Sequence, residues 1–551
     1  MEERERSGGR NSERAGDSFA VSAPTISLPK GGGAISGIGE KFAANPVTGT
    51  GSLTVPIYAT AGRNGFGPQL SLSYDSGQGN SPFGFGWSLS LPAITRKTAK
   101  GLPLYQDSEE SDVFILSGAE DLMPGLVQTD GNWRRDVVES RTVFGRQYAI
   151  HSYRPRVEGL FARIERWVDN ADPSATFWRS ITKDNITSWY GKTEESRIAD
   201  PADATRVFSW LICESYDDKG NVVSYRYKPE DSAGVDRSQV QERNRTNIAR
   251  SVQRHLKRIR YGNRTPHFPD LNVAEPVALP SDWCFELVLD YGEHDPQNPV
   301  PDDTAQPWAC RLDPFSTYRP TFELRTYRLC RRVLMFHHFA GEPGVGLNCL
   351  VRSTDLTHAS APAADPSEPF YAYLLSVSQT GYIRQSSGYL SRSLPPLEFT
   401  YTVATVDETV RDVNRESLEN LPGGIEDNAY CWVDLNGEGV SGILTEQGTS
   451  WFYKPNYGPA NQCIVGGQEL TSPWFGPTEL VALQPSIAAL NSGGQQLLDL
   501  SGDGHLDLVE FEVPTPGYYE RTADGASWKP YRPFPELRFW TGGIPTCASL
   551  I

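Results

Sequence analysis

Apolar side chains recur at every second position in many separate segments of this 551-residue chain. The longest run places Trp283, Phe285, Leu287, Leu289 and Tyr291 on one side of the backbone. Side chains two residues apart share one face of a β-strand, whereas a helical face needs spacings of three and four. The pattern therefore predicts strands that bury one face and expose the other to water.

The same alternation marks other segments, and turn-forming residues separate them. These segments are Leu53 to Ile57, Leu70 to Tyr74, Trp87 to Leu91, Phe208 to Ile212, Val223 to Tyr227 and Leu397 to Val403. Asp217–Asn221 is one such turn, and it predicts a hairpin between its neighbours. With 51 Gly, 41 Pro and 11 % aromatic residues, the composition also suits short strands and tight turns. We expect an all-β protein built around a large antiparallel sheet.

The net charge of −17 argues against nucleic acid and anionic membranes as general partners, because both repel an acidic chain. The most basic segment, Arg243 to Arg264, is interpreted as a solvated strand face, since Ile259 and Tyr261 alternate with arginines. No run approaches about 18 apolar residues, so no transmembrane segment is expected. The eight cysteines include no Cys-x-x-Cys pair and are interpreted as free thiols.

Two acidic, glycine-rich loops predict cation sites. The second loop offers side-chain oxygens at alternate positions and one carbonyl: Asp499, Ser501, Asp503, Asp507 and the His505 carbonyl. Calcium prefers several such oxygens, some of them carboxylate. The first loop offers Asp434, Asn436 and Glu438 and is the weaker site, because Gly442 stands where the second loop has Asp507. The alternative for both loops is an Asp-Gly turn between strands without a metal.

The two loops start 65 residues apart, at Asp434 and Asp499, and a repeat of this length suggests blades of a repeated array. Polar composition and a Pro-Gly-Gly breaker mark a boundary before them. We expect a disordered tail at 1–25, a sheet domain at 26–404, a linker at 405–425 and an incomplete second domain at 426–551.

Several segments resemble known toxin proteins. They are Ser52–Tyr58, Gly67–Gly77, Asn80–Leu89, Leu256–Asn263, Leu287–His294, Arg311–Arg319, Phe322–Cys330 and Val333–His337. They resemble the N-terminal region of the Salmonella virulence plasmid B protein, and equally the B components of insecticidal Tc toxin complexes. The acidic loops are similar to FG-GAP-type propeller repeats, and Tyr216–Asn221 is similar to the Tyr-Asp repeat of Rhs proteins.

The resemblance implies an Rhs-like shell sheet followed by a partial FG-GAP-type β-propeller. In Tc complexes the B component and an Rhs-type C component form a cocoon around a toxic domain, and the propeller docks on a pore-forming A component. The resemblance therefore implies both of these partners and a secreted, non-enzymatic protein. The N-terminal residues lack a recognisable cleavable signal, so we expect a cytoplasmic stage before export by another route. Tc B components are longer than this chain, which suggests a truncated product.

The residues favour no enzyme. The ADP-ribosyltransferase part of the virulence plasmid B protein uses a Ser-Thr-Ser motif and a Glu-x-Glu pair, but this chain has only Glu510-Phe-Glu512. His337 and His338 are interpreted as one inward and one outward strand residue, and Asp290, Glu293 and His294 as a strand-end turn. Two alternatives stay open: the translocation half of an ADP-ribosylating toxin that lacks its catalytic domain, and an adhesion module with calcium-stapled blades.

Overall fold

The computed structural model describes most of residues 40–534, and the fold below refers to these described residues. Within that range it leaves out 46–49, 100, 119, 158, 160, 274–275, 303–305, 360–369, 403–409, 411, 421–429, 438, 449, 459–461, 466–467, 472, 487, 489–493, 502–503, 512–515, 523–524 and 526. The predicted tail at 1–25 and most of the predicted linker therefore lie outside the described residues. The predicted domain boundaries stay predictions.

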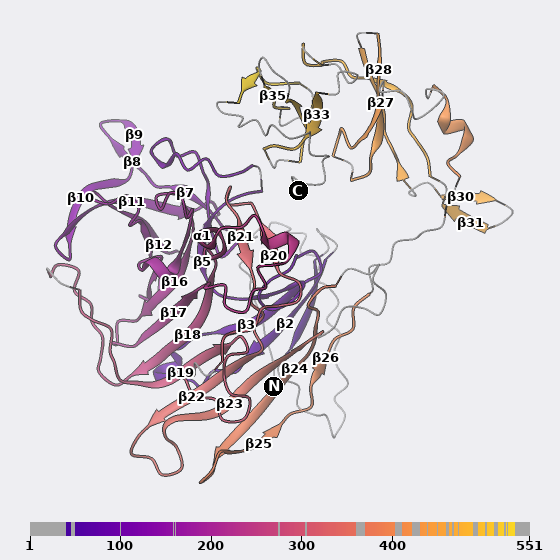
Figure 1. The fold of residues 1–551 in the computed structure, drawn as a ribbon. Coiled ribbons are helices and arrows are strands. Elements are labelled where there is room, and N and C mark those ends of the chain that lie inside the picture. The colour runs from indigo at the N-terminus through magenta and orange to yellow at the C-terminus, as the bar shows by residue number, and fades with distance from the viewer. Residues whose placement is uncertain are drawn as a thin grey trace, which may run out of the picture.

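Strands dominate the described chain (Figure 1), which confirms the all-β prediction. The helical segments are short: α1 (Asn247–Arg250) and the 3₁₀ turns η1 (Arg63–Gly65), η2 (Asp107–Glu109), η3 (Glu194–Ser196), η4 (Val240–Glu242) and η5 (Arg415–Leu418). No helix in the described ranges is long and apolar enough to cross a membrane.

One antiparallel sheet of eighteen strands forms most of the molecule. Its strands are β5 (Ala93–Arg96), β6 (Phe114–Leu116), β7 (Glu120–Pro124), β10 (Val137–Val143), β11 (Arg146–Pro155), β12 (Arg163–Asp169), β13 (Phe177–Ile181), β14 (Thr187–Tyr190), β15 (Arg197–Ala199), β16 (Val207–Tyr216), β17 (Val222–Pro229), β18 (Arg254–Asn263), β19 (Trp283–Asp290), β22 (Arg332–Phe339), β23 (Gly346–His358), β24 (Leu374–Arg384), β25 (Tyr389–Ser393) and β26 (Leu397–Glu398). Only β26 covers the strand predicted at Leu397 to Val403, so that strand is shorter than expected.

Part of this sheet closes on itself. The pairings run β5–β6–β7–β11–β12–β13–β14–β16 and return from β16 to β5, which makes a ring of eight strands. Aromatic side chains from different strands meet inside it: Phe114 lies 5.0 Å from Trp178, 5.7 Å from Trp210 and 5.8 Å from Tyr153, measured between ring centroids. A ring of this strand number is just wide enough for side chains to fill.

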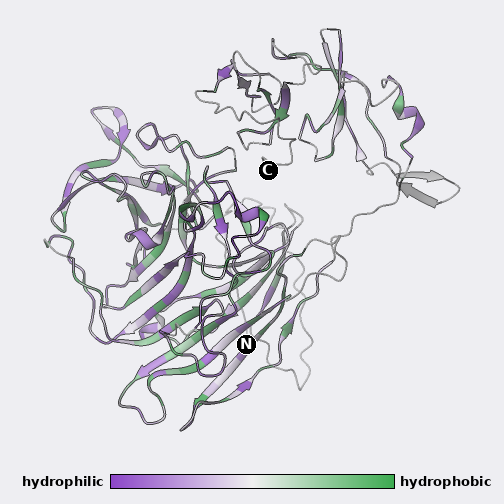
Figure 2. Cartoon of the chain, in the orientation of Figure 1, coloured by the Kyte–Doolittle hydropathy of each residue, from purple (hydrophilic) through white to green (hydrophobic). Residues whose placement is uncertain are grey.

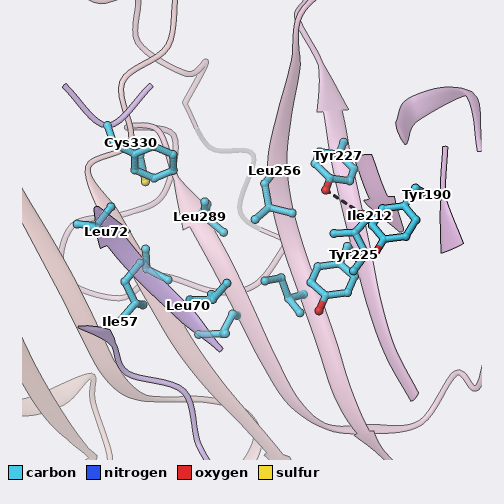
Figure 3. Packing of buried hydrophobic residues seen from close by; sticks show 14 of the residues in the cluster. Ile57, Leu70, Leu72, Tyr190, Ile212, Tyr225, Tyr227, Leu256, Leu289 and Cys330 are labelled. Atoms are coloured by element: carbon cyan, nitrogen blue, oxygen red, sulfur yellow. Dashed lines mark hydrogen bonds between the residues drawn. The ribbon is translucent and has the colours of Figure 1, made fainter. Parts of the chain in front are cut away.

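A second sheet covers one face of the large sheet beyond the ring. It has the order β1 (Lys41–Asn45), β2 (Thr50–Ile57), β3 (Leu70–Asp75) and β4 (Trp87–Leu89), which confirms the predicted meander. Ile57, Leu70 and Leu72 of this sheet belong to the same buried cluster as Leu256 and Leu289 (Figure 3). The main core therefore lies between two layers of strands.

The predicted wet face is wrong for the central strands, because both faces are covered. In β19, Phe285 and Leu287 face β1–β4, whereas the intervening Glu286 and Val288 are 3 % and 0 % exposed on the other face. Glu286 accepts hydrogen bonds from Arg258 and Arg260. Figure 2 shows the resulting interleaving of hydrophilic and hydrophobic segments along the strands. The predicted alternation of side chains is present, but the second face is buried too. Glu286 is buried there by pairing with arginines, and Val288 by packing against Leu334, Phe336 and Leu350.

The hairpin predicted around Asp217–Asn221 is confirmed. Strands β16 and β17 pair from Tyr216↔Val222 outward, with Glu214 opposite Ser224. The Asp217 carboxylate accepts the backbone N–H groups of Lys219 and Asn221 at 2.9 Å each, so the side chain holds the turn. This is the role that aspartate takes in such turns.

Two of the segments that resemble the toxin family interlock. Arg311 donates to the Ser81 carbonyl at 2.7 Å, and the Asp313 carboxylate accepts from the Asn80 side chain at 2.8 Å. His358 lies 3.0 Å from the Phe83 carbonyl through its Nε2. The loop before β4 is thereby fixed to segments more than 200 residues away in sequence, which anchors the covering sheet.

The C-terminal part holds two further four-stranded antiparallel sheets. The first has the order β27 (Tyr430–Val433), β28 (Gly442–Gln447), β29 (Ser450–Lys454), β32 (Glu479–Leu480), and the second has the order β33 (Gln495–Leu498), β34 (Asp507–Glu510), β35 (Gly517–Tyr519), β36 (Arg532–Pro533). Three two-stranded hairpins complete the description: β8 (Leu126–Thr129) with β9 (Asn132–Arg135), β20 (Phe315–Thr317) with β21 (Leu324–Thr326), and β30 (Gln462–Val465) with β31 (Gln468–Thr471).

Charged substitution at Phe285 should abolish soluble expression. The centroid of its ring lies 5.2 Å from that of Tyr261 and 5.1 Å from that of His337. Loss of a buried phenylalanine ring alone lowers the free energy of unfolding by about 3–5 kcal/mol, and Phe285→Asp would also bury a carboxylate there. Phe42→Asp is the matched control, because Phe42 is 68 % exposed. The soluble yield and melting curve of both variants check this, and a well-folded Phe285→Asp protein would contradict the assigned face.

His358 should make the fold sensitive to mild acid. Burial lowers the pKa of His358 from 6.5 to about 4. Because the pKa of His358 is lower in the folded protein than in the unfolded chain, protonation of this side chain favours unfolding. The folded state therefore keeps its full stability above about pH 6.5 and loses part of it as the pH falls toward 4. Between pH 7.5 and 5.5 the linkage relation gives a loss of about 1.3 kcal/mol. Urea unfolding at both pH values measures the free energy of unfolding of wild type and of His358→Gln. If both proteins lose the same amount between pH 7.5 and 5.5, His358 is not the cause.

Candidate functional site

The two acidic loops have the same local structure. Asp434 Oδ2 accepts the backbone N–H of Gly439 at 2.7 Å, and Asp499 Oδ2 accepts that of Gly504 at 3.0 Å. Both glycines have positive φ, at 82° and 86°, a conformation that favours glycine over other residues. The strands before the loops, β27 and β33, are also offset by the same 65 residues. The predicted repeat therefore corresponds to two equivalent strand–loop–strand units.

Asp507, predicted as a calcium ligand, is held by the protein itself. The side chain is 1 % exposed, and its two carboxylate oxygens accept the backbone N–H groups of Leu500 and Arg521 at 3.0 Å each. Asp507 therefore fixes the loop and the neighbouring strand whether or not a metal binds.

The two loops also lie against each other. A Cβ on Gly437 would lie 3.5 Å from the carbonyl oxygen of Gly504. Arg521, 7 % exposed, donates its guanidinium to the Leu435 carbonyl of the first loop and to the Gly525 carbonyl at 2.9 Å. Because its backbone N–H also donates to Asp507, Arg521 joins both loops. Sequence patterns gave no signal for this role, since Arg521 lies outside both acidic loops.

The other predicted ligands are placed only in part. Asp503 and Glu438 lie outside the described residues. Asp499 and Asn436 are exposed, and His505 is half-buried. The Ser501 carbonyl accepts a hydrogen bond from the backbone N–H of Leu102 at 3.1 Å. The described residues thus leave the two predicted calcium sites as a hypothesis.

Another cluster has the composition of a metal centre but the bonding of an ion-pair network. Ligand atoms of Asp290, Glu293 and His294 lie within 4.8 Å of one another, and all three residues are buried. Lys257 contacts both Glu293 and His294, with Nζ 2.8 Å from His294 Nε2, and Arg332 pairs with Asp290 at 2.7 Å. All three candidate ligands are thus already paired with a lysine or an arginine side chain.

The titration behaviour supports the ion-pair assignment. Burial lowers the pKa of Lys257 and of His294, and the Lys257 charge lowers the pKa of His294 further. Burial alone would raise the pKa of Asp290, but the Arg332 charge and the Gly292 N–H outweigh it and lower the pKa. His294 is thereby kept neutral, and its Nδ1 lies 3.0 Å from the Val300 carbonyl as a donor would. The strand-end turn predicted here is confirmed by the Asp290 bond to the Gly292 N–H at 2.8 Å.

The remaining catalytic candidates occupy structural positions. His337 lies 2.8 Å from the Thr60 hydroxyl under the covering sheet, whereas His338 faces Glu286 at 3.1 Å on the opposite side. The two histidines therefore point to opposite faces of the strand as predicted, but the outward orientation is wrong, because the His338 side chain is only 13 % exposed. Glu510 accepts a hydrogen bond from the Gln495 side chain at 2.9 Å. Glu512 lies outside the described residues.

A protein-family model matches much of this fold. The model of the family described as Salmonella virulence plasmid 65kDa B protein matches residues 45–339, which run from the covering sheet to β22. A mono(ADP-ribosyl)transferase SpvB from Salmonella choleraesuis (strain SC-B67) is 40 % identical over 321 residues, 58 % of this chain and 51 % of the relative. The SpvB of Salmonella dublin gives the same identity and coverage over 320 residues. The chain spans about half the length of these relatives.

Solved structures with a similar fold come from two kinds of protein. The Photorhabdus luminescens Tc holotoxin pore matches with a TM-score of 0.63 and 30 % identity over 94 % of this chain and 22 % of the matched chain. The TcdB2–TccC3 complex matches with a TM-score of 0.64 and 28 % identity over 93 % and 23 % of the two chains. The N-terminal domain of the effector SpvB from Salmonella typhimurium strain LT2 matches with a TM-score of 0.52 and 36 % identity over 60 % of this chain and 98 % of the domain.

Two aspartates of the second loop should respond differently to calcium. Asp503→Ala should lower the melting temperature in calcium and change it little in chelator, because it removes only a predicted metal ligand. Asp507→Asn should lower it in both conditions, because Asp507 also caps two backbone N–H groups. Differential scanning calorimetry in calcium and in EGTA compares the variants. If Asp503→Ala lowers the melting temperature equally in calcium and in EGTA, the loop is only a turn and does not bind calcium.

Proposed function

The chain belongs to the family of the Salmonella virulence plasmid 65kDa B protein, and from this membership we propose that it is a non-enzymatic wall component of a secreted toxin complex. The supporting observation is the extent of the structural likeness to the Tc toxin chains, which at 94 % coverage reaches beyond the family region into the C-terminal sheets. The likeness to the SpvB N-terminal domain covers 60 % of the chain. The Tc type of architecture therefore accounts for more of the described residues.

In this proposal the large sheet is part of a cocoon that encloses the toxic domain of an Rhs-type C component. The sheet is closed on one side by its eight-stranded ring, whereas β25 pairs only with β24 among the described strands. An open edge offers backbone N–H and C=O groups for strand pairing with a further wall segment. A container wall needs stability and coverage, and neither requires a catalytic residue.

The two C-terminal four-stranded sheets are, in the same proposal, blades of a propeller that docks on a pore-forming A component. Four-stranded antiparallel sheets are the usual blade of such a propeller. Their shared apolar cluster includes Leu435 and Trp451 of the first sheet and Leu508 of the second. Calcium bound at the acidic loops would fix the turns that join the inner strands of each blade.

One other function has a specific observation behind it, and a second depends on a test not covered by the likeness. The identity of 40 % to mono(ADP-ribosyl)transferases favours a translocation or targeting half of such a toxin, because the likeness covers only 51 % of those relatives. Calcium binding at the loops without a toxin partner would favour an adhesion module. Transfer of ADP-ribose from NAD to actin by the purified chain would overturn the non-enzymatic proposal.

Co-expression with a candidate Rhs-type C component should yield a stable complex. Size-exclusion chromatography with light scattering is expected to show a mass equal to the sum of one copy of each chain. Ile383→Asp should weaken the complex without lowering the stability of the free chain, because Ile383 is 64 % exposed beside the open edge and faces Leu390 on β25. Val410→Asp is the matched control, since Val410 is 95 % exposed on the segment after the sheet. Separate elution of the two chains at micromolar concentration would count against the cocoon role.

A further inference from the structure

A groove of about 800 Å³ lies where the large sheet meets the second C-terminal sheet. We call it the junction groove. Its first wall comes from the segments around β5 and β6, and its second wall from the Asp499–Asp507 loop and β35–β36. The backbone N–H of Leu102 on the first wall donates to the Ser501 carbonyl on the second at 3.1 Å. The two walls are therefore in direct contact at one point.

The two walls together carry four cations and three carboxylates. On the first wall Asp121 lies 2.8 Å from Lys97 and 3.7 Å from Arg156. On the second wall Glu520 pairs with Lys529 and lies 3.3 Å from Arg532. Each wall thus sets two cations around one carboxylate, and the outer cation of each pair is largely exposed, Arg156 at 72 % and Arg532 at 58 % of the side chain. This is a local cationic site in a chain whose net charge is −17.

The third carboxylate of the groove, Asp112, is already neutralised. It pairs at 2.7 Å with Arg96, whose side chain is 1 % exposed. The same carboxylate accepts the backbone N–H groups of Leu104 and Tyr105 at 2.8 and 3.0 Å. Asp112 therefore holds the loop that forms the first wall and does not cancel the charge of Lys97 and Arg156.

The lining between these charges is apolar and partly exposed. Leu104 is 65 %, Val113 42 % and Leu500 38 % exposed, and all three line the groove. A small group of exposed apolar side chains bordered by charges is typical of a binding surface. The volume also falls within the range of about 300–1,000 Å³ that ligand clefts occupy.

Two residues at the first wall have strained backbone, and hydrogen bonds hold them in this conformation. Tyr105 and Thr321 have φ of 59° and 71°, which is unfavourable for residues other than glycine. The Tyr105 hydroxyl donates to the Pro320 carbonyl at 2.5 Å, and Arg206 donates to the Thr321 hydroxyl at 2.7 Å. Strained residues that their surroundings keep fixed are concentrated at binding sites, because a preformed wall lowers the entropic cost of binding.

From this arrangement we infer that the junction groove binds an extended segment of a partner protein that carries carboxylates between apolar side chains. Its carboxylates reach Arg156 and Arg532, and its apolar side chains cover Leu104, Val113 and Leu500. Nucleic acid fits less well, because the whole chain carries a net charge of −17 and the exposed leucine and valine side chains of the groove offer bases no stacking surface. Such a segment would bridge the two walls and fix the C-terminal sheets on the large sheet.

The test uses three fluorescein-labelled probes and measures fluorescence anisotropy at low and at high salt. The first is a ten-residue peptide of alternating glutamate and leucine, the second replaces glutamate by lysine, and the third is a twelve-residue oligothymidylate. The full chain should bind only the first, with an affinity that falls in high salt. The double variant Arg156→Glu with Arg532→Glu should weaken this binding at least tenfold.

The double variant keeps the Lys97–Asp121 and Lys529–Glu520 pairs but sets a glutamate beside each carboxylate, so its melting temperature should fall only slightly and the chain should stay folded. Arg392→Glu is the matched control, because Arg392 is exposed on β25 at the other end of the sheet, and it should bind as wild type. Undiminished binding by the double variant would overturn the assignment of the groove. Absence of peptide binding, or tighter binding of the oligonucleotide, would overturn the assignment of its occupant.

Discussion

The structure depends on strands that are covered on both faces, because this forces every charged side chain within them to find a partner. Glu286 shows the consequence. Burial alone would raise its pKa, but the hydrogen bond from His338 and the charges of Arg260 and Arg258 outweigh burial and lower it. Removing one partner of such a buried group typically costs about 3–5 kcal/mol, because the remaining charge stays desolvated. Buried groups of opposite charge therefore stabilise the sheet only as complete networks.

The same reasoning separates one buried cluster from the catalytic site that it resembles in composition. Asp290, Glu293 and His294 have the side chains of a metal or acid–base site, yet Lys257 contacts Glu293 and His294, and Arg332 pairs with Asp290. Catalytic sites keep charged groups accessible to a substrate, whereas this cluster uses all of them to join β18, β19 and β22. The titratable side chains of this cluster thus hold neighbouring strands together.

Local sequence pattern predicted the strands but could not predict how distant strands close on one another. The alternation around Phe285, and the turn at Asp217, depend on neighbours within a few residues, and both were predicted correctly. The ring closes through β16 with β5, which brings Trp210 opposite Ile94 across more than 100 residues. Burial of Glu286 likewise depends on Arg258, which a period-two pattern cannot tell from a solvated residue. Of the candidate site, the loops could be located from glycine and aspartate alone, whereas Arg521 could not.

The two acidic loops show how far their shared geometry extends and where it ends. Both use the first aspartate to hold a glycine N–H five residues later. They diverge at the eighth position after it, where a Cβ on Gly442 would lie 2.5 Å from the Tyr453 hydroxyl and 2.6 Å from the Lys454 carbonyl. The first loop therefore has no room for the counterpart of Asp507, whatever it binds. In the second loop Asp507 already caps two backbone N–H groups, so a cation there would depend chiefly on Asp499, Ser501 and Asp503.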